Sequence, residues 1–156
     1  MRTDHEWTRG EFLISTNSAL LDLDVVHKFL TQSYWAAGVS REVVQQSIEN
    51  SLPFGLYNRD RQIGFARVIT DYATFAYLAD VFVLDEFRGD GLGKWLIEVV
   101  TTIPELAGLR RWMLATRDAH GLYERSGFVR LSQPDRWMER QTSRVDSKPQ
   151  PPGEPG

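Results

Sequence analysis

The most informative segment of this chain is an apolar run that leads into a glycine-rich loop, Val81-Phe82-Val83-Leu84-Asp85-Glu86-Phe87-Arg88-Gly89-Asp90-Gly91-Leu92-Gly93-Lys94. Because glycine has no Cβ, such a loop can turn its amide groups toward one point and admit a phosphate close to the backbone. Apolar residues then recur at helical spacing from Leu92 to Val100. A helix there adds its unpaired first-turn N–H groups and the positive end of its dipole. The segment predicts an anion cradle, with Arg88 and Lys94 as extra positive charges.

A turn that merely needs glycines is the alternative explanation of this loop. Two other nucleotide-binding motifs do not fit it. A dinucleotide fingerprint requires G-x-G-x-x-G in a parallel βαβ unit, whereas this loop reads G-x-G-x-G after strands typical of hairpins. A Walker A loop requires Ser or Thr after Gly-Lys, but Trp95 follows Gly93 and Lys94.

The chain on both sides of the loop predicts an α+β fold. Helices are expected from Asp22 to Gly38, from Ser40 to Pro53, from Leu92 to Pro104 and, with Asp118 as N-cap, up to Gly127. Strands are expected at 11–16, 54–57, 62–70, 73–84, 111–116, 128–131 and 136–140. Short polar turns between the middle strands are typical of an antiparallel meander. The predicted domain is a mixed, mostly antiparallel central sheet flanked by about four helices.

Composition limits the classes of function. The 156 residues, 42% hydrophobic and 25% charged, fit one domain at 1–140, and the Pro/Gly-rich segment 141–156 is expected to be a disordered tail. A net charge of −3 argues against a general nucleic-acid or anionic-membrane binder. Without cysteine, and with three dispersed histidines, the sequence offers no obvious metal site. No signal peptide or membrane span is expected, which makes the cytoplasm the predicted location.

Two motifs together resemble the GNAT family of N-acetyltransferases. The loop from Arg88 to Gly93 resembles that family's cofactor motif, R/Q-x-x-G-x-G/A, at the start of its central helix. The segment Ala119-His120-Gly121-Leu122-Tyr123-Glu124-Arg125-Ser126-Gly127-Phe128 is similar to the family's A-x-x-L-Y-x-x-x-G-F. The likeness in element order covers roughly residues 11–140. Asp85 stands where many members have proline, and Thr116 where many have asparagine.

The resemblance implies that acetyl-CoA lies in a V-shaped opening between the strands at 73–84 and 110–116. Its pantetheine arm would pair with the backbone around Val81, Phe82 and Val83. Its pyrophosphate would lie on the loop formed by Arg88, Gly89, Asp90, Gly91, Leu92, Gly93 and Lys94. Thr116 would stand at the position of one further cofactor hydrogen bond, which its departure from asparagine leaves open.

The implied reaction is acetyl transfer to a primary amine by direct attack in a ternary complex. It needs an uncharged amine, a group that stabilises the developing oxyanion and a proton source for the departing thiolate. Tyr123 matches a tyrosine that lies near the coenzyme A sulfur in related enzymes, so we expect it to be the acid; the alternative is a packing residue. Asp80, a carboxylate in an apolar strand, is the first candidate base, and its alternative is an ion pair with Arg67. His120 is the second candidate base.

The acceptor pocket is expected where the first two helices face the sheet. Its candidate aromatic residues are Tyr34, Trp35, Phe54, Phe65, Tyr72, Phe75 and Tyr77. Arg67 and Asp71 could hold a charged group of the substrate. A small-molecule amine is the expected acceptor; a protein N-terminus or lysine, a longer acyl donor and a non-catalytic acyl-CoA-binding module stay open as alternatives. A homodimer is a further expectation.

Overall fold

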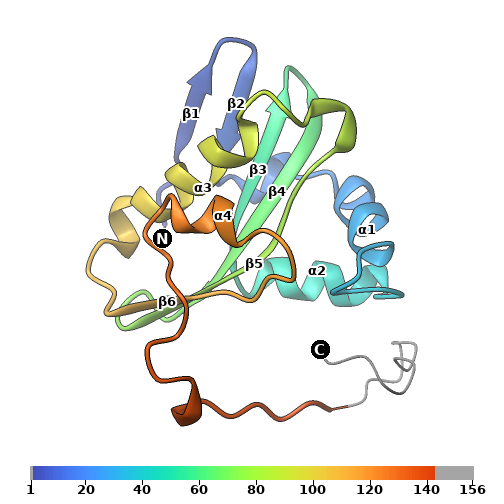
Figure 1. The fold of residues 1–156 in the computed structure, drawn as a ribbon. Coiled ribbons are helices and arrows are strands. Elements are labelled where there is room, and N and C mark those ends of the chain that lie inside the picture. The colour runs from blue at the N-terminus through green and yellow to red at the C-terminus, as the bar shows by residue number, and fades with distance from the viewer. Residues whose placement is uncertain (1, 143–156) are drawn as a thin grey trace.

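The chain folds around one open sheet with helices on both faces (Figure 1). A computed structural model describes residues 2–142. The strands are β1 (Glu6–Arg9), β2 (Phe12–Ser15), β3 (Leu52–Asn58), β4 (Arg61–Thr70), β5 (Phe75–Val83) and β6 (Arg111–Met113). The helices are α1 (Leu23–Thr31), α2 (Arg41–Glu49), α3 (Leu92–Thr102) and α4 (His120–Glu124). Short 3-10 turns lie at Ser18–Leu20, Asp85–Phe87, Pro104–Leu106 and Pro134–Arg136.

The strands lie in the order β1-β2-β3-β4-β5-β6. All neighbours are antiparallel except β5 and β6, which run parallel because α3 carries the chain across one face between them. The predicted α+β class and the mixed, mostly antiparallel sheet are confirmed. None of the helices between residues 2 and 142 has the length and apolar content that crossing a membrane needs.

Two apolar layers hold the helices on the sheet. On one face, Leu92, Leu96 and Val100 of α3 pack in one cluster with Phe54 and Leu56 of β3. On the other face α1 and α2 supply Val26, Leu30, Val44 and Ile48, which cluster with Phe65 and Phe82. Asp22 caps α1 by accepting from the amides of Asp24 and Val25, and Ser40 caps α2 through the amide of Val43.

Several predicted boundaries were wrong. The first helix ends at Thr31, well before Gly38, because the chain turns where the amide of Ser33 bonds the carbonyl of Leu30. Pro53 lies inside β3 and does not end α2, which stops at Glu49. β1 was missed because Glu6–Arg9 carries only one large apolar residue, Trp7, and forms through its ladder with β2.

The predicted closing strands at 128–131 and 136–140 do not form within the described residues. That segment contains only the 3-10 turn Pro134–Arg136, and β6 covers only part of the predicted 111–116. The short helix α4 is capped at Ala119 with no side-chain bond, so the prediction for Asp118 was wrong; the hydroxyl of Thr116 accepts from the amide of Ala119 at 3.1 Å instead. The predicted tail at 141–156 lies outside the described residues except for its first two.

The hydroxyl of Tyr57 is a buried polar group without a hydrogen-bond partner among the described residues. Burial is the main cause that raises the pKa of this phenol, and Asp22 adds to it. We expect Tyr57→Phe to leave the free energy of unfolding unchanged or to raise it by up to about 1 kcal/mol, because an unpaired buried hydroxyl costs more than it contributes. Urea unfolding measures this difference.

Gly64→Ala is the matched control in the neighbouring strand. A Cβ at Gly64 would lie 2.8 Å from the carbonyl oxygen of Phe82, so the strand must shift and we expect a loss of about 1–3 kcal/mol. A loss of more than about 1 kcal/mol in Tyr57→Phe would show that its hydroxyl has a partner after all.

Candidate active site

A β-bulge at Asp80 interrupts the strand that precedes the glycine loop. Phe65 pairs with Phe82 and Arg67 with Ala79, so Asp80 and Val81 together face the single residue Ala66. Asp80 has φ 56°, in the left-handed region that aspartate tolerates better than most residues. A bulge bends its strand and increases the local twist.

Because the bulge adds one residue to β5, each later side chain points to the face opposite to the one it would have in a regular strand. Leu78 and Val83 belong to the same apolar cluster under α3, although their odd separation would place them on opposite faces of a regular strand. Phe82 points to the other face, where it stacks on Phe29 with ring centroids 4.0 Å apart. The side chain of Phe82 is therefore core, and only its backbone is placed to meet a cofactor.

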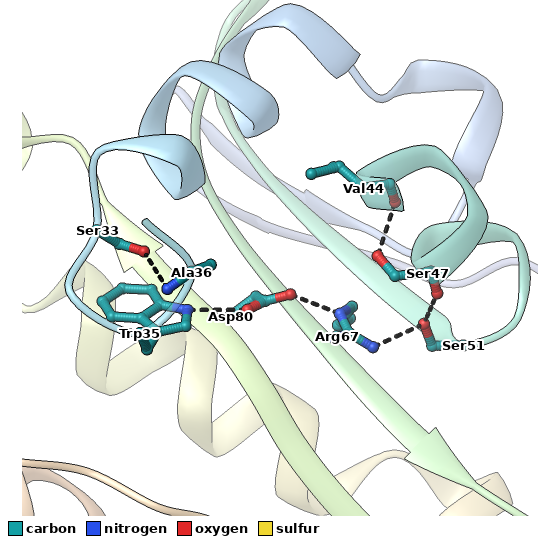
Figure 2. A network of polar contacts seen from close by, with 8 residues as sticks. All are labelled: Ser33, Trp35, Ala36, Val44, Ser47, Ser51, Arg67 and Asp80. Carbon is teal, nitrogen blue, oxygen red and sulfur yellow. Dashed lines mark hydrogen bonds and ion pairs between the residues drawn. The ribbon is translucent and has the colours of Figure 1, made fainter. Parts of the chain in front are cut away.

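Asp80 lies at the centre of a polar network on the α1–α2 side of the sheet (Figure 2). Arg67 Nε donates to Asp80 Oδ2 at 2.6 Å, and Trp35 Nε1 donates to Asp80 Oδ1 at 2.8 Å. The side chains of Arg67 and Asp80 are only 15% and 10% exposed. Arg67 also reaches Ser51 Oγ at 3.4 Å. The ion pair that was the alternative explanation of Asp80 is present, and both of its carboxylate oxygens are bonded, so its role as a base stays a prediction.

The loop between α1 and α2 connects this bulge to the chain after β6. Trp35 holds Asp80, while the neighbouring Tyr34 accepts a hydrogen bond from the amide of Arg117 at 3.1 Å. The guanidinium carbon of Arg117 lies 4.0 Å from the centre of the Tyr34 ring. One loop thus contacts both sides of the region where β5 and β6 part. The sequence alone did not indicate a role for Arg117. Its position directly after a predicted strand was the one feature that could have indicated it.

The pairing of β5 and β6 ends at Tyr77 and Met113. Beyond this point, the backbone edge of 78–83 that faces away from β4 has no partner strand among residues 2–142, as the expected V-shaped opening requires. On the side of β6 and α4 there is a cavity of about 500 Å³. Thr116, His120 and Tyr123 all line it, together with Trp112, Met113, Leu114 and Phe128.

Tyr123 is half-buried in this cavity wall and packs edge-to-face on Phe128, with ring centroids 6.0 Å apart. Burial raises the pKa of Tyr123 to about 12, and the nearby Tyr34 adds to the rise. The phenol therefore keeps its proton through the neutral pH range and can donate it in a hydrogen bond. Packing and proton donation are both compatible with this placement.

The glycine loop forms an open turn at the start of α3. Gly89 and Gly91 have φ 97° and 77°, and no atom lies within 4 Å of a Cβ built on either. The amide of Trp95 makes the bond to Gly91 O at 3.0 Å that begins the helix, so the preceding amides of the first turn face outward. Gly93 lies against Val83, whose Cγ2 would be 3.9 Å from an added Cβ. This shape fits a phosphate, which needs the space that side chains would fill.

The two cations of the loop differ in their surroundings. Arg88 donates from Nε to the carbonyl of Val83 at 3.0 Å and pairs with Asp85 at 2.8 Å. Arg88 therefore links the loop to β5. Its hydrogen bond occupies the carbonyl oxygen of Val83, one of the backbone groups expected to pair with the pantetheine arm. Lys94 has a looser contact with Glu98, at 3.9 Å, and is half-exposed.

Other residues named as candidates from the sequence lie in the core or in a turn. Phe54 and Phe65 are core, and Tyr72 is in the hairpin turn after β4. Asp71 accepts from three amides and from the hydroxyl of Thr74, which lowers the pKa of its carboxyl and fixes that turn. A further cavity of about 290 Å³, near His5 and Glu105, is lined by none of the predicted catalytic or cofactor residues.

Comparisons with known proteins agree on one family. Residues 49–130 match the family model described as the acetyltransferase (GNAT) domain. The Gibberella zeae protein named "Putative acetyltransferase FG08082" is 33% identical over 138 residues, which cover 75% of this chain and 78% of that protein. A crystal structure of a GNAT-family protein from Xanthomonas campestris pv. campestris is 46% identical, covers 95% of this chain and 99% of that one, and superposes with a TM-score of 0.83.

A more distant structure carries a ligand. It is a GNAT family acetyltransferase from Elizabethkingia anophelis with acetyl-CoA bound, 14% identical, covering 86% of this chain and 90% of that one, with a TM-score of 0.60. At 14% identity, the similarity between the two chains shows a shared fold and nothing more.

The ion pair between Arg67 and Asp80 makes a specific prediction about stability. Asp80→Asn keeps a side chain that tolerates positive φ and can accept from Trp35, but leaves Arg67 without a counter-charge. We expect it to lower the free energy of unfolding by on the order of 3 kcal/mol, and Arg67→Met to do the same by stranding Asp80. Urea unfolding of both variants and of the double variant measures the coupling. The double variant should lose clearly less than the sum; additive losses would contradict a coupled pair.

Proposed function

Because this chain belongs to the GNAT family and is an acetyltransferase, we propose that it moves an acetyl group from acetyl-CoA to a primary amine of a small molecule. The observation that carries the proposal is the arrangement at the end of β5. The open glycine loop comes soon after β5 in the chain. Tyr123 lines the cavity beside β6, whose pairing with β5 ends at Tyr77 and Met113. A donor with a phosphate at one end and a thioester at the other would use both features.

The residues of the loop supply the binding part of this function. The outward amides at the start of α3 and the space over Gly89 and Gly91 suit a pyrophosphate. The free backbone edge of 78–83 suits the amides of a pantetheine arm, and Thr116 lies in the same cavity wall as Tyr123. The acetyl-CoA-bound relative of the same fold supports this donor.

Bound acetyl-CoA supplies an acetyl thioester, whose carbonyl carbon the amine attacks while the carbon–sulfur bond breaks. The raised pKa of Tyr123 keeps its proton in place for a hydrogen bond to the departing sulfur. A neutral amine is required, so a base or water must remove the ammonium proton first. Asp80 and His120 are the candidates, and Asp80 would have to exchange one of its two hydrogen bonds to act.

The acceptor would approach from the side of the α1–α2 loop, opposite α3, where Tyr34 and Trp35 are exposed. Their rings offer a surface for an apolar or aromatic amine. The small-molecule acceptor, the direct attack in a ternary complex and the cytoplasmic location stay predictions of the sequence. Transfer to a protein amine and non-catalytic acyl-CoA binding are the outcomes that the experiments below distinguish.

Acetyl-CoA should stabilise the folded protein through the glycine loop. At 100 times its Kd, we expect about 2.7 kcal/mol and a rise in Tm of several degrees. Gly91→Trp should fold with a lower Tm and show no rise with the ligand, because the indole fills the space over the loop. Gly108→Trp is the matched control, since Gly108 is also exposed with no atom near its Cβ. An equal rise in all three proteins would place the ligand elsewhere.

Tyr123→Phe should lower kcat by about 10²–10⁴-fold and leave the Kd of acetyl-CoA unchanged, because it removes the hydroxyl group that donates the proton and keeps the ring. Turnover is measured as thiol release with a panel of small amines, and the chain's lack of cysteine removes the usual background in this assay. Tyr57→Phe, at a buried tyrosine of β3 whose hydroxyl has no hydrogen-bond partner among the described residues, is the control.

Unchanged turnover in Tyr123→Phe would assign Tyr123 to packing alone. Stabilisation by acetyl-CoA without turnover on any small amine would favour a protein acceptor or a binding module.

A further inference from the structure

Arg117 carries a guanidinium group that two contacts with Tyr34 hold in place. Its backbone amide donates to the Tyr34 hydroxyl at 3.1 Å, and its guanidinium carbon lies 4.0 Å from the centre of the Tyr34 ring. The other contacts between a guanidinium and a ring face within residues 2–142 are longer, at 4.8–5.4 Å. Arg117 therefore has a fixed position although its side chain is 66% exposed.

The charge of Arg117 is weakly neutralised. Its one ion pair in the described part of the chain is with the adjacent Asp118, at 4.0 Å, and that side chain is itself 70% exposed. By contrast, the exposed Arg41, Arg59 and Arg61 each pair with a carboxylate at 2.6–2.8 Å. A guanidinium that stacks on a ring keeps the N–H groups at its edge available, and two of these match the two oxygens of a carboxylate.

Arg117 lies where the acceptor side of the site meets the Tyr123 cavity. It follows Thr116 in the chain, and Thr116 lines the cavity of about 500 Å³ together with Tyr123. Tyr34, on which Arg117 stacks, is close enough to Tyr123 to add to the raised pKa of that phenol. A group bound at the edge of the Arg117 guanidinium would therefore be near the proposed place of the acetyl thioester.

An apolar surface lies next to this cation. Trp35 packs edge-to-face on Tyr34 with ring centroids 5.1 Å apart, and the two residues are 41% and 42% exposed. The indole N–H of Trp35 is already bonded to Asp80 (Figure 2), so the exposed part of Trp35 offers apolar contact. This side of the site thus combines a fixed cation with an aromatic surface.

We propose that the acceptor is a free amino acid with an apolar or aromatic side chain, whose α-carboxylate is bound by Arg117. The carboxylate accepts hydrogen bonds from the edge of the guanidinium, while the side chain lies against Trp35. The α-amine, on the carbon next to the carboxylate, is then held near Tyr123. A peptide N-terminus fits less well, because its first carboxyl group is an uncharged amide. This assignment rests on the proposed acetyl transfer and names the class of its acceptor.

Transfer to this acceptor gives an N-acetyl amino acid and free coenzyme A. The neutral α-amine forms a bond to the acetyl carbonyl carbon, the carbon–sulfur bond breaks, and its electron pair stays on the sulfur. The nitrogen loses one proton to a base or water, Tyr123 gives one to the sulfur, and exchange with water restores both groups. The carboxylate takes no part in these bond changes, so Arg117 acts by binding the acceptor.

Matched pairs of amines test the acceptor class. L-phenylalanine is compared with phenethylamine, and L-leucine with isoamylamine, so that the members of each pair differ only in the carboxylate. Turnover is measured as thiol release from acetyl-CoA. In the wild type, we expect kcat/KM for the amino acid to exceed that for its amine by about 10- to 100-fold in at least one pair, as for one charge-assisted contact.

Arg117→Gln should remove this preference. We expect it to lower kcat/KM for the amino acid by about 10- to 100-fold, mainly through KM, and to change kcat/KM for the amine by less than about 3-fold. Arg117→Lys keeps the charge without the planar fork and should retain part of the preference. Arg2→Gln is the matched control, since Arg2 is also exposed and lies over a tyrosine ring, that of Tyr72, at 5.2 Å. An equal loss on both members of a pair would assign Arg117 to structure alone and overturn the proposal.

Two further outcomes separate the acceptor class from the acetyl transfer itself. Turnover that favours the amine over the amino acid in both pairs overturns the amino-acid acceptor and leaves acetyl transfer to a small amine standing. Turnover of no member of either pair, by a protein that acetyl-CoA stabilises against heat, overturns both.

Discussion

The ion pair between Arg67 and Asp80 holds β5 in a shape that a regular strand does not have. A left-handed residue in the middle of a strand is strained, and it persists only where the surroundings fix it. Here the carboxylate is fixed from both sides, by a guanidinium of β4 and by the indole of Trp35. The bulge that results puts Phe82 into the core under α1 and Val83 under the glycine loop. The position of the loop therefore follows from a polar contact on the opposite face of the sheet.

The same bulge connects the two halves of the active site. β5 twists away from β6 beyond Tyr77, and the loop with Tyr34 and Trp35 spans from Asp80 to Arg117. One side offers backbone amides and open space for an anion. The other offers exposed aromatic rings and a network of charged groups. A donor and an acceptor that enter from opposite faces would meet where the strands part, close to a tyrosine that retains its proton.

The sequence predicted those features that depend on local chemistry. The glycine loop, the first turn of α3 and the segment around Tyr123 each consist of consecutive residues whose conformation follows from their own composition. The bulge was not predicted, because a single aspartate with positive φ leaves the apolar pattern of a strand almost unchanged. β1 was missed because a strand as polar as Glu6–Arg9 forms only when a neighbour supplies its ladder. The closing strands at 128–131 and 136–140 were expected from composition, but a strand forms only when it pairs with a neighbour, and neither segment joins the sheet within the described residues.

We propose that acetyl-CoA binds along β5, with its phosphates on the glycine loop and its thioester beside Tyr123. A crystal structure of the protein grown with acetyl-CoA tests this most directly. We expect pyrophosphate oxygens within hydrogen-bond distance of the backbone amides between Gly89 and Lys94, and the sulfur within reach of the Tyr123 hydroxyl. A ligand bound away from this loop, or a sulfur on the far side of the sheet from Tyr123, would contradict it.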